Sequence, residues 1–342
     1  MSTTTVTTIT MGSIQEPSLD SRIPEAEKIK ILLNSTLYDE SLRDLAYIPR
    51  FQHRLSILRA WSIPAGSRIL DIGCGQGEST LALALELGER ARVTGIDTAL
   101  PDYGTPYTVS QAQAHSLRSV LGPRIEFHRQ DPATHLLPPP EKESGDPQQV
   151  IVHPTTPKYD AAVLCHSIWY FPDHATVTEL FQTLARAGIP RLYLAEYDYS
   201  GPLPAQQPHI LAARSQALFH ASKTPRAAGR FTLNIRAAPA AAAVLEAARG
   251  AGFQVVREGV VVPDLGMLEG HFEARYTQGD KYAARVRAEG LAPGQEEAIL
   301  AYAPRIREKL EALKEAGVEK AMVMDTRWFE FELQKGGTVD SF

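Results

Sequence analysis

Cysteine, long apolar runs and excess positive charge are all scarce in this 342-residue chain. Its two cysteines, Cys74 and Cys165, are too few for a disulfide framework or a zinc site, and they fit a reducing, cytoplasmic compartment. No apolar run approaches the ~20 residues of a membrane span, so no membrane partner is expected. The formal net charge of −5 argues against nucleic acid as a partner, because phosphate binding needs clustered Lys and Arg.

Three glycines on alternate positions, Gly73, Gly75 and Gly77, follow an apolar run that predicts a buried strand. A helix-forming run over residues 79–87 comes directly after them. Glycine permits positive φ and lets a backbone lie close to a ligand. A strand, a glycine-rich turn and a helix N-terminus in this order indicate a nucleotide-type binding site.

The spacing of the glycines selects among nucleotide cofactors. It is G-x-G-x-G, and Glu78 stands where the dinucleotide fingerprint has its third glycine. The stretch Asp-Ile-Gly-Cys-Gly-Gln-Gly, which starts at Asp71, resembles motif I of the class I S-adenosylmethionine (SAM) methyltransferases. SAM has no pyrophosphate to place at the helix N-terminus, so an acid there is tolerable. Its ammonium group needs an acceptor, which Asp71 or nearby carbonyl groups could supply.

The chain divides into three predicted parts. A Ser/Thr-rich tail over 1–20 lacks the basic start of a secretory signal and is expected to be disordered. A helical segment follows over 21–62. The resemblance implies that 63–342 form the SAM-binding methyltransferase domain, with cap insertions at 199–235 and 263–320.

The predicted fold class is α/β, with a doubly wound, mostly parallel seven-stranded sheet of the Rossmann-like methyltransferase type. Apolar runs alternate with helical patterns of ten to fifteen residues, which is typical of parallel sheets. Further strands are predicted at 92–97, 124–129, 159–165, 191–196, 253–262 and 322–333. The last of these is expected to insert antiparallel beside the sixth strand. Helices before the domain and in the cap complete the prediction.

Ends of successive strands supply the other predicted cofactor contacts. Asp97 ends the second strand, 20 residues after Gly77, where an acid can accept both ribose hydroxyls. The resemblance implies that Asp131, after the third strand, takes the adenine amine. The predicted cofactor-binding residues are Asp71, Gly73, Cys74, Gly75, Gly77, Asp97, Thr98, Asp131, Pro132 and His166.

The predicted catalytic residues follow the fourth and fifth strands: His166, Tyr170 and Glu196. Ligands of open α/β sheets bind beyond the carboxyl ends of the strands. His166 has three open roles: general base for a hydroxyl or thiol acceptor, cofactor contact, or structural histidine. Trp169, Tyr170 and Phe171 could stack a flat substrate or the adenine, or steady a cation. They could equally be the apolar seat of the next helix, which is the interpretation favoured for Phe171. Glu196 and Asp198 could orient an amine substrate, or be solvated strand-end acids without function.

The resemblance implies SAM-dependent methyl transfer to an O, N or S atom of a small or medium-sized molecule, such as a secondary metabolite. The signature N/D-P-P-Y/F of nucleobase and glutamine methylation is absent, and Cys165-His166 stand where the magnesium-dependent type has its acids, so metal independence is expected. Two alternatives stay open. One is a methyltransferase-like protein that binds SAM without transferring methyl, and the other is an NAD-dependent oxidoreductase.

An apolar stripe in the 263–320 insertion needs a partner surface. A short hairpin would suffice to join the last two strands, so these residues require another explanation. The stripe either closes a lid over the acceptor site or forms the interface of a homodimer. Its members are Ile299, Tyr302, Ile306, Leu310 and Leu313.

Overall fold

The fold is taken from a computed structural model. It describes residues 23–138, 158–223, 235–264 and 266–334. The predicted tail over 1–20 lies outside the described residues.

Strands and helices alternate along the described chain. The strands are β1 (Arg68–Ile72), β2 (Arg92–Asp97), β3 (Ile125–Arg129), β4 (Ala161–Cys165), β5 (Arg191–Tyr197), β6 (Phe253–Val261) and β7 (Thr326–Leu333). The helices are α1 (Glu25–Ser35), α2 (Ile48–Trp61), α3 (Glu78–Glu86), α4 (Val109–Leu117), α5 (Pro132–Leu136), α6 (His174–Arg186), α7 (Gln207–Ser222), α8 (Ala241–Gly250), α9 (Glu269–Thr277), α10 (Asp280–Ala288), α11 (Pro293–Leu300) and α12 (Tyr302–Glu315).

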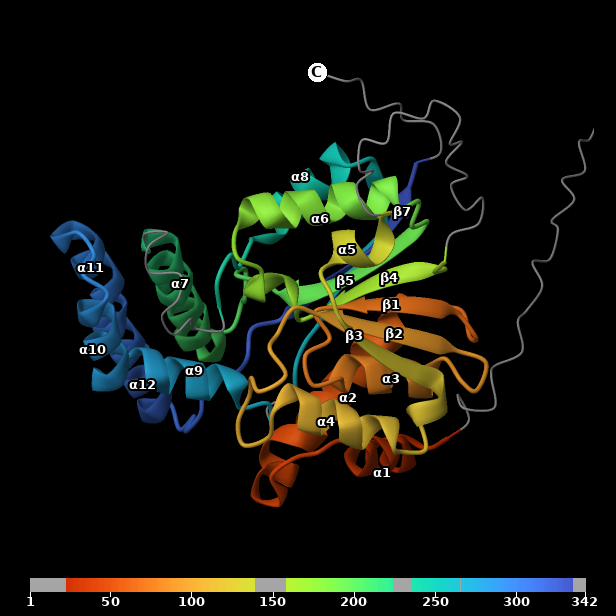
Figure 1. The fold of residues 1–342 in the computed structure, drawn as a ribbon. Coiled ribbons are helices and arrows are strands. Elements are labelled where there is room, and N and C mark those ends of the chain that lie inside the picture. Colours follow the sequence, from red (N-terminus) through yellow and green to blue (C-terminus); the bar gives the residue numbers. More distant parts are fainter. Residues whose placement is uncertain (1–22, 139–157, 224–234, 265, 335–342) are drawn as a thin grey trace, which may run out of the picture.

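The described residues form a seven-stranded sheet in the order β3-β2-β1-β4-β5-β7-β6. Strands β1 to β5 pair in parallel, and β7 is antiparallel to both of its neighbours. Helices α1 to α4 cover one face, and α5, α6 and α8 cover the other (Figure 1). This arrangement confirms the predicted fold class, including the antiparallel insertion of the last strand.

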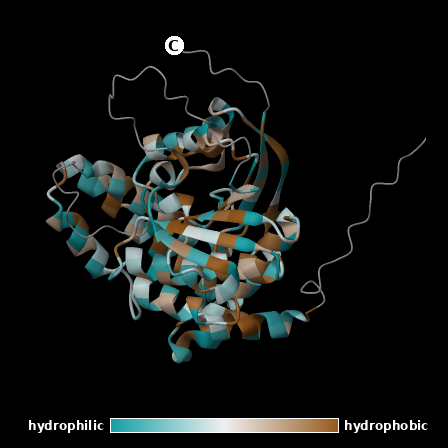
Figure 2. Ribbon diagram, turned by 45° about the vertical axis from the view of Figure 1, so that its right-hand side comes forward, coloured by the Kyte–Doolittle hydropathy of each residue, from teal (hydrophilic) through white to brown (hydrophobic). Residues whose placement is uncertain are grey.

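Both faces of the central strands are buried. In β4, Val163 belongs to the core under α2 and α3, and Leu164 belongs to the core under α6 and α8. Successive side chains of a strand point to opposite faces, so a strand covered on both sides reads as one continuous apolar run. Hydrophobic residues accordingly mark the strands in the middle of the molecule (Figure 2).

The predicted start of the last strand at residue 322 is wrong: β7 begins at Thr326. The preceding backbone bonds to the cap instead of continuing the sheet. Met322 N–H donates to the carbonyl oxygen of Ala205, and Met324 N–H donates to Nδ1 of His209. An apolar sequence predicts burial there, but burial against a helix does not require a strand.

The helices of the two insertions form one cap beside the sheet (Figure 1). Helix α7, from the first insertion, packs against α9, α11 and α12 of the second. Ile299, Ile306 and Leu313 of the predicted apolar stripe are buried, and Tyr302 and Leu310 are partly buried. Ile299 packs with Phe219 of α7, and Ile306 packs with Leu211. The stripe is therefore covered by the same chain.

Candidate active site

The three glycines of the β1–α3 loop have positive φ for different reasons. A Cβ on Gly73 would lie 2.7 Å from Cβ of Ser167, and one on Gly77 would lie 2.7 Å from the ring of Phe127. A Cβ on Gly75 would meet no atom within 4 Å. Packing therefore requires the outer two glycines, whereas Gly75 faces open space above the strand end.

Asp71 is buried beneath this loop. Its Oδ2 accepts hydrogen bonds from the hydroxyls of Ser79 and Thr80, both at 2.7 Å. Its Oδ1 has no hydrogen-bond partner among the described residues. Burial raises the pKa of this carboxyl to about 6, and the two hydroxyl donors oppose the rise. Asp71 thus keeps one acceptor unused, as a ligand cation would require.

Asp97 connects the end of β2 to the glycine loop. Its Oδ2 accepts the N–H of Gly75 at 2.8 Å, and its Oδ1 accepts the N–H of Ala99 at 2.7 Å. Each carboxylate oxygen can accept more than one hydrogen bond. The side chain can therefore hold the loop and still receive ribose hydroxyls.

The other predicted cofactor residues lie around the same loops. Asp131 caps α5, accepting hydrogen bonds from the N–H and the hydroxyl of Thr134. Pro132 is the first residue of that helix, and Thr98 is exposed. Cys74 is buried, and burial raises the pKa of its thiol. Their cofactor roles remain predictions.

Glu78 holds the helix after the glycine loop to two other parts of the chain. It pairs with Arg50 at 2.8 Å and with Arg54 at 2.9 Å, both on α2. Arg50 also pairs with Glu269, the first residue of cap helix α9, at 2.8 Å. The acid that replaces a fingerprint glycine thus joins the cofactor loop, the N-terminal helices and the cap.

His166 turns the chain at the end of β4. Its φ is +53°, an uncommon conformation for a residue with a side chain, and its N–H donates to the carbonyl oxygen of Ala195. Its Nδ1 lies 3.3 Å from Oε1 of Glu196, and its Nε2 lies 3.4 Å from Oγ1 of Thr326. Tyr197 covers the ring, with centroids 4.4 Å apart. The structure thus brings together two of the three predicted catalytic residues.

Burial disfavours the charged form of both side chains of this pair. The side chains of His166 and Glu196 are 9% and 7% exposed. Burial raises the pKa of Glu196 to about 8, although the backbone N–H groups of Tyr197 and Trp169 donate to its oxygens. Burial and the positive charge of Arg54 lower the pKa of His166 to about 3.

The aromatic residues after β4 divide into buried and exposed ones. Trp169 is 2% exposed and packs against Tyr197 and Tyr199, so its ring belongs to the core. Tyr170 is 44% exposed, and its hydroxyl makes no hydrogen bond to any described residue. Of these aromatic rings, that of Tyr170 is therefore the more open to a substrate.

Three further site residues were missed from the sequence: His53 on α2, His209 on α7 and Thr326 at the start of β7. His53 Nε2 lies 2.8 Å from the Thr326 hydroxyl, and the His209 ring contacts Tyr197. The three side chains are buried. A lone histidine within a helix gives no sequence signal for such a position.

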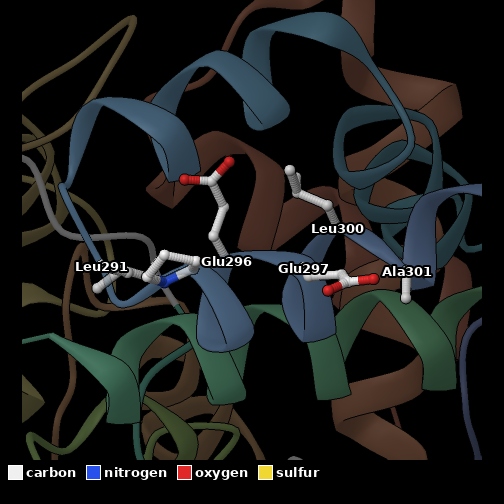
Figure 3. A pocket seen from close by; sticks show the side chains of 6 residues that line it. Leu291, Glu296, Glu297, Leu300 and Ala301 are labelled. Carbon is white, nitrogen blue, oxygen red and sulfur yellow. The ribbon is translucent and has the colours of Figure 1, made fainter.

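A hollow of about 710 Å³ opens on the cap and is a separate feature (Figure 3). It is lined by Leu291, Pro293, Glu296, Glu297, Leu300 and Ala301. None of these residues belongs to the glycine loop or to a strand end. The chemistry-bearing side chains lie elsewhere, so we do not place the active site there.

Comparison with known proteins decides the family. Residues 63–136 match the family model described as a methyltransferase domain. Two methyltransferases of Diaporthe leptostromiformis, phomM′ and phomM, are 42% and 41% identical over 347 residues, covering 89% of each chain. The chain belongs to the class I SAM-dependent methyltransferases. A solved cyclopropane-fatty-acyl-phospholipid synthase-like protein from Lactobacillus casei shares the fold of the methyltransferase, with TM-score 0.68, 23% identity and coverage of 90% and 99%.

The methyltransferase uses SAM as its cofactor, and its loop residues fit that group. Gly75 leaves open the space that a Cβ would fill, and Asp71 holds an unpartnered acceptor for a cation. Within the described residues, no helix is long and apolar enough to cross a membrane.

Three buried histidines predict a steep loss of stability in acid. Burial lowers the pKa of His53 to about 2 and that of His166 and His209 to about 3. Because the unfolded residues titrate near 6.5, the unfolded chain binds more protons below that pH. The free energy of unfolding should therefore fall as the pH falls from 6.5 towards 3, by at most about 1.4 kcal/mol per pH unit for each histidine.

Denaturation measured between pH 8 and 4.5 checks this prediction. The raised pKa values of Glu196 and Asp71 act in the opposite sense. They lower stability as the pH rises from about 4.5 to 8 for Glu196 and from about 4 to 6 for Asp71, and so offset part of the acid slope. We expect a maximum near pH 6.5, which Glu196→Gln should broaden on the alkaline side. His209→Asn should reduce the acid slope by up to about 1.4 kcal/mol per pH unit, the contribution of one histidine. An unchanged slope in that variant would contradict the burial argument.

Proposed function

We propose that the methyltransferase methylates an amine nitrogen of a small or medium-sized molecule without a metal ion. One observation carries the choice of nitrogen. Both ring nitrogens of His166 lie within 3.4 Å of protein partners, Glu196 and Thr326. A histidine with both nitrogens occupied, and with a pKa that burial lowers, is a poor proton acceptor for a hydroxyl or thiol.

An amine acceptor needs less from the protein. When bound, SAM supplies an electrophilic methyl group on a positively charged sulfur. A neutral amine already has a free lone pair, so the residues have to orient it in line and exclude water. Burial favours the neutral amine over its ammonium form. The extra proton of the product can pass to water after release, and no base is required during the transfer.

Several features support the rest of the proposal. The end of β4 carries Cys165 and His166, and no three His, Cys, Asp or Glu side chains of the described residues are grouped to hold a metal ion. The net charge of −5 favours a small molecule over nucleic acid. Both cysteines are buried and unpaired, as in proteins of a reducing, cytoplasmic compartment.

The test measures conversion of SAM to S-adenosylhomocysteine with paired amines and alcohols of matched shape. We expect turnover with amines only, unchanged by EDTA. The pH dependence of kcat/KM should follow the pKa of the acceptor, shifting between two amines of different basicity. His166→Ala should cost less than the ~10²–10⁴-fold typical of a lost general base.

Two results would overturn this choice. Turnover of a hydroxyl or thiol acceptor, with a rate that rises through the histidine range whichever acceptor is used, would make His166 a base. Loss of turnover in EDTA, restored by a divalent cation, would contradict metal independence.

A further inference from the structure

Four buried polar side chains from four separate elements form one hydrogen-bonded row. Glu196 of β5 contacts His166 after β4, which contacts Thr326 of β7, which contacts His53 of α2. The successive distances are 3.3, 3.4 and 2.8 Å. Thr326 is 0% exposed and His53 is 5% exposed, so both side chains lie away from the bulk solvent.

The hydroxyl of Thr326 lies between two histidine nitrogens, His53 Nε2 and His166 Nε2. A hydroxyl has a single proton, so it donates to one of these nitrogens and accepts from the other. When both rings are neutral, one of the two Nε2 atoms therefore carries a proton and the other does not. If His166 is protonated at Nε2, its Nδ1 is an acceptor, and only a protonated Glu196 can donate to it.

We propose that Thr326 and His53 are positioning residues of the methyltransferase, which fix the tautomer and the orientation of His166 through the Thr326 hydroxyl. A fixed His166 holds the carboxyl of Glu196, which lies near the end of β5 and within electrostatic range of Tyr170. The raised pKa of Glu196 agrees with a donating, protonated carboxyl.

The charged groups near His166, and the ring of His209, are bonded to other partners, so the row supplies the side-chain hydrogen bonds of His166. Arg54 of α2 is committed to Glu78 at 2.9 Å, and Glu269 of α9 is committed to Arg50 at 2.8 Å. His209 of α7 accepts the N–H of Met324. Tyr197 covers one face of the His166 ring, and burial raises the pKa of its hydroxyl well above the ordinary value.

The experiment compares Thr326→Val with Thr326→Ser in the full-length protein. Valine keeps the shape but removes the hydroxyl, and serine keeps the hydroxyl. Ring nitrogens of 15N-labelled histidine report protonation by NMR, with His166→Gln to assign the signals. We expect Thr326→Val to shift the His166 nitrogens and to lower turnover about tenfold, the equivalent of one hydrogen bond, with SAM affinity unchanged. Serine should restore both readouts.

His53→Gln tests the row from its far end, and it also serves if Thr326→Val fails to fold. It should change which His166 nitrogen carries the proton. Because the rings of His53 and His166 also lie 5.5 Å apart between centroids, this tautomer change, and not a small shift of the signals, reports the effect passed through Thr326. Wild-type His166 signals in the folded variants, or a lower melting temperature alone, would overturn the proposal. The proposal rests on methyl transfer but not on the acceptor atom: a wrong amine assignment changes which acceptors react and leaves the nitrogen signals as expected.

Discussion

Gly75→Val should weaken SAM binding by about 100-fold or more while the protein stays folded. The Cβ of this residue would point into space that no protein atom occupies within 4 Å, so its methyl groups would collide with the cofactor rather than with the chain. Asp97 should still accept the N–H of residue 75, because the backbone is retained. Titration calorimetry with SAM and with S-adenosylhomocysteine measures the effect.

Gly188→Val is the matched control. Gly188 has φ +67°, close to the +52° of Gly75, and a Cβ there also meets no atom within 4 Å. It lies after α6, away from the loop that holds the cofactor. Both substitutions place a β-branched residue at positive φ and cause similar backbone strain. The difference between their affinities for SAM therefore reports the contact with the cofactor. Equal SAM affinities in the two variants would contradict the assignment of the loop.

The sequence was sufficient to predict the sheet and the glycine loop because both depend on local patterns. Apolar runs gave the strands, and the departure from the dinucleotide spacing at Glu78 indicated the correct cofactor. The pairing of Glu78 with Arg50 and Arg54 was not predictable, because these residues are distant in sequence. The sequence alone does not distinguish these two arginines from the others as partners of Glu78. The same holds for His53, whose partner Thr326 lies on the last strand.

The roles of the residues after β4 were harder to predict, because exposure decides them. Trp169 and Tyr170 are adjacent and chemically similar, yet one belongs to the core and the other is open. Asp198 and Glu196 are both acids at the end of β5, yet Asp198 lies 3.7 Å from Arg327 while Glu196 faces His166. Only the packing of the neighbouring elements separates such pairs.

The second large effect is expected from the cap. We propose that it closes over the acceptor site and sets the choice of substrate. Two contacts support this: Glu269 at the start of α9 pairs with Arg50, and His209 of α7 contacts Tyr197, whose ring covers His166. A cover at this place would also exclude water from the transfer. The apolar stripe was the reason to consider a homodimer. Because it already packs against α7 of the same chain, it no longer supports one.

Replacing residues 266–318 with a short turn should abolish acceptor methylation and spare SAM binding. Because the deletion would uncover the apolar face of α7, the variant should also carry Leu211→Gln and Phe219→Gln. Calorimetry with SAM tests whether the remaining domain is folded, and light scattering gives its mass. Retained SAM affinity with no methylated product is the expected result, since the glycine loop and Asp97 lie outside the replaced segment. If the variant keeps its turnover but changes its number of subunits, the helices form a subunit interface and the lid proposal is wrong.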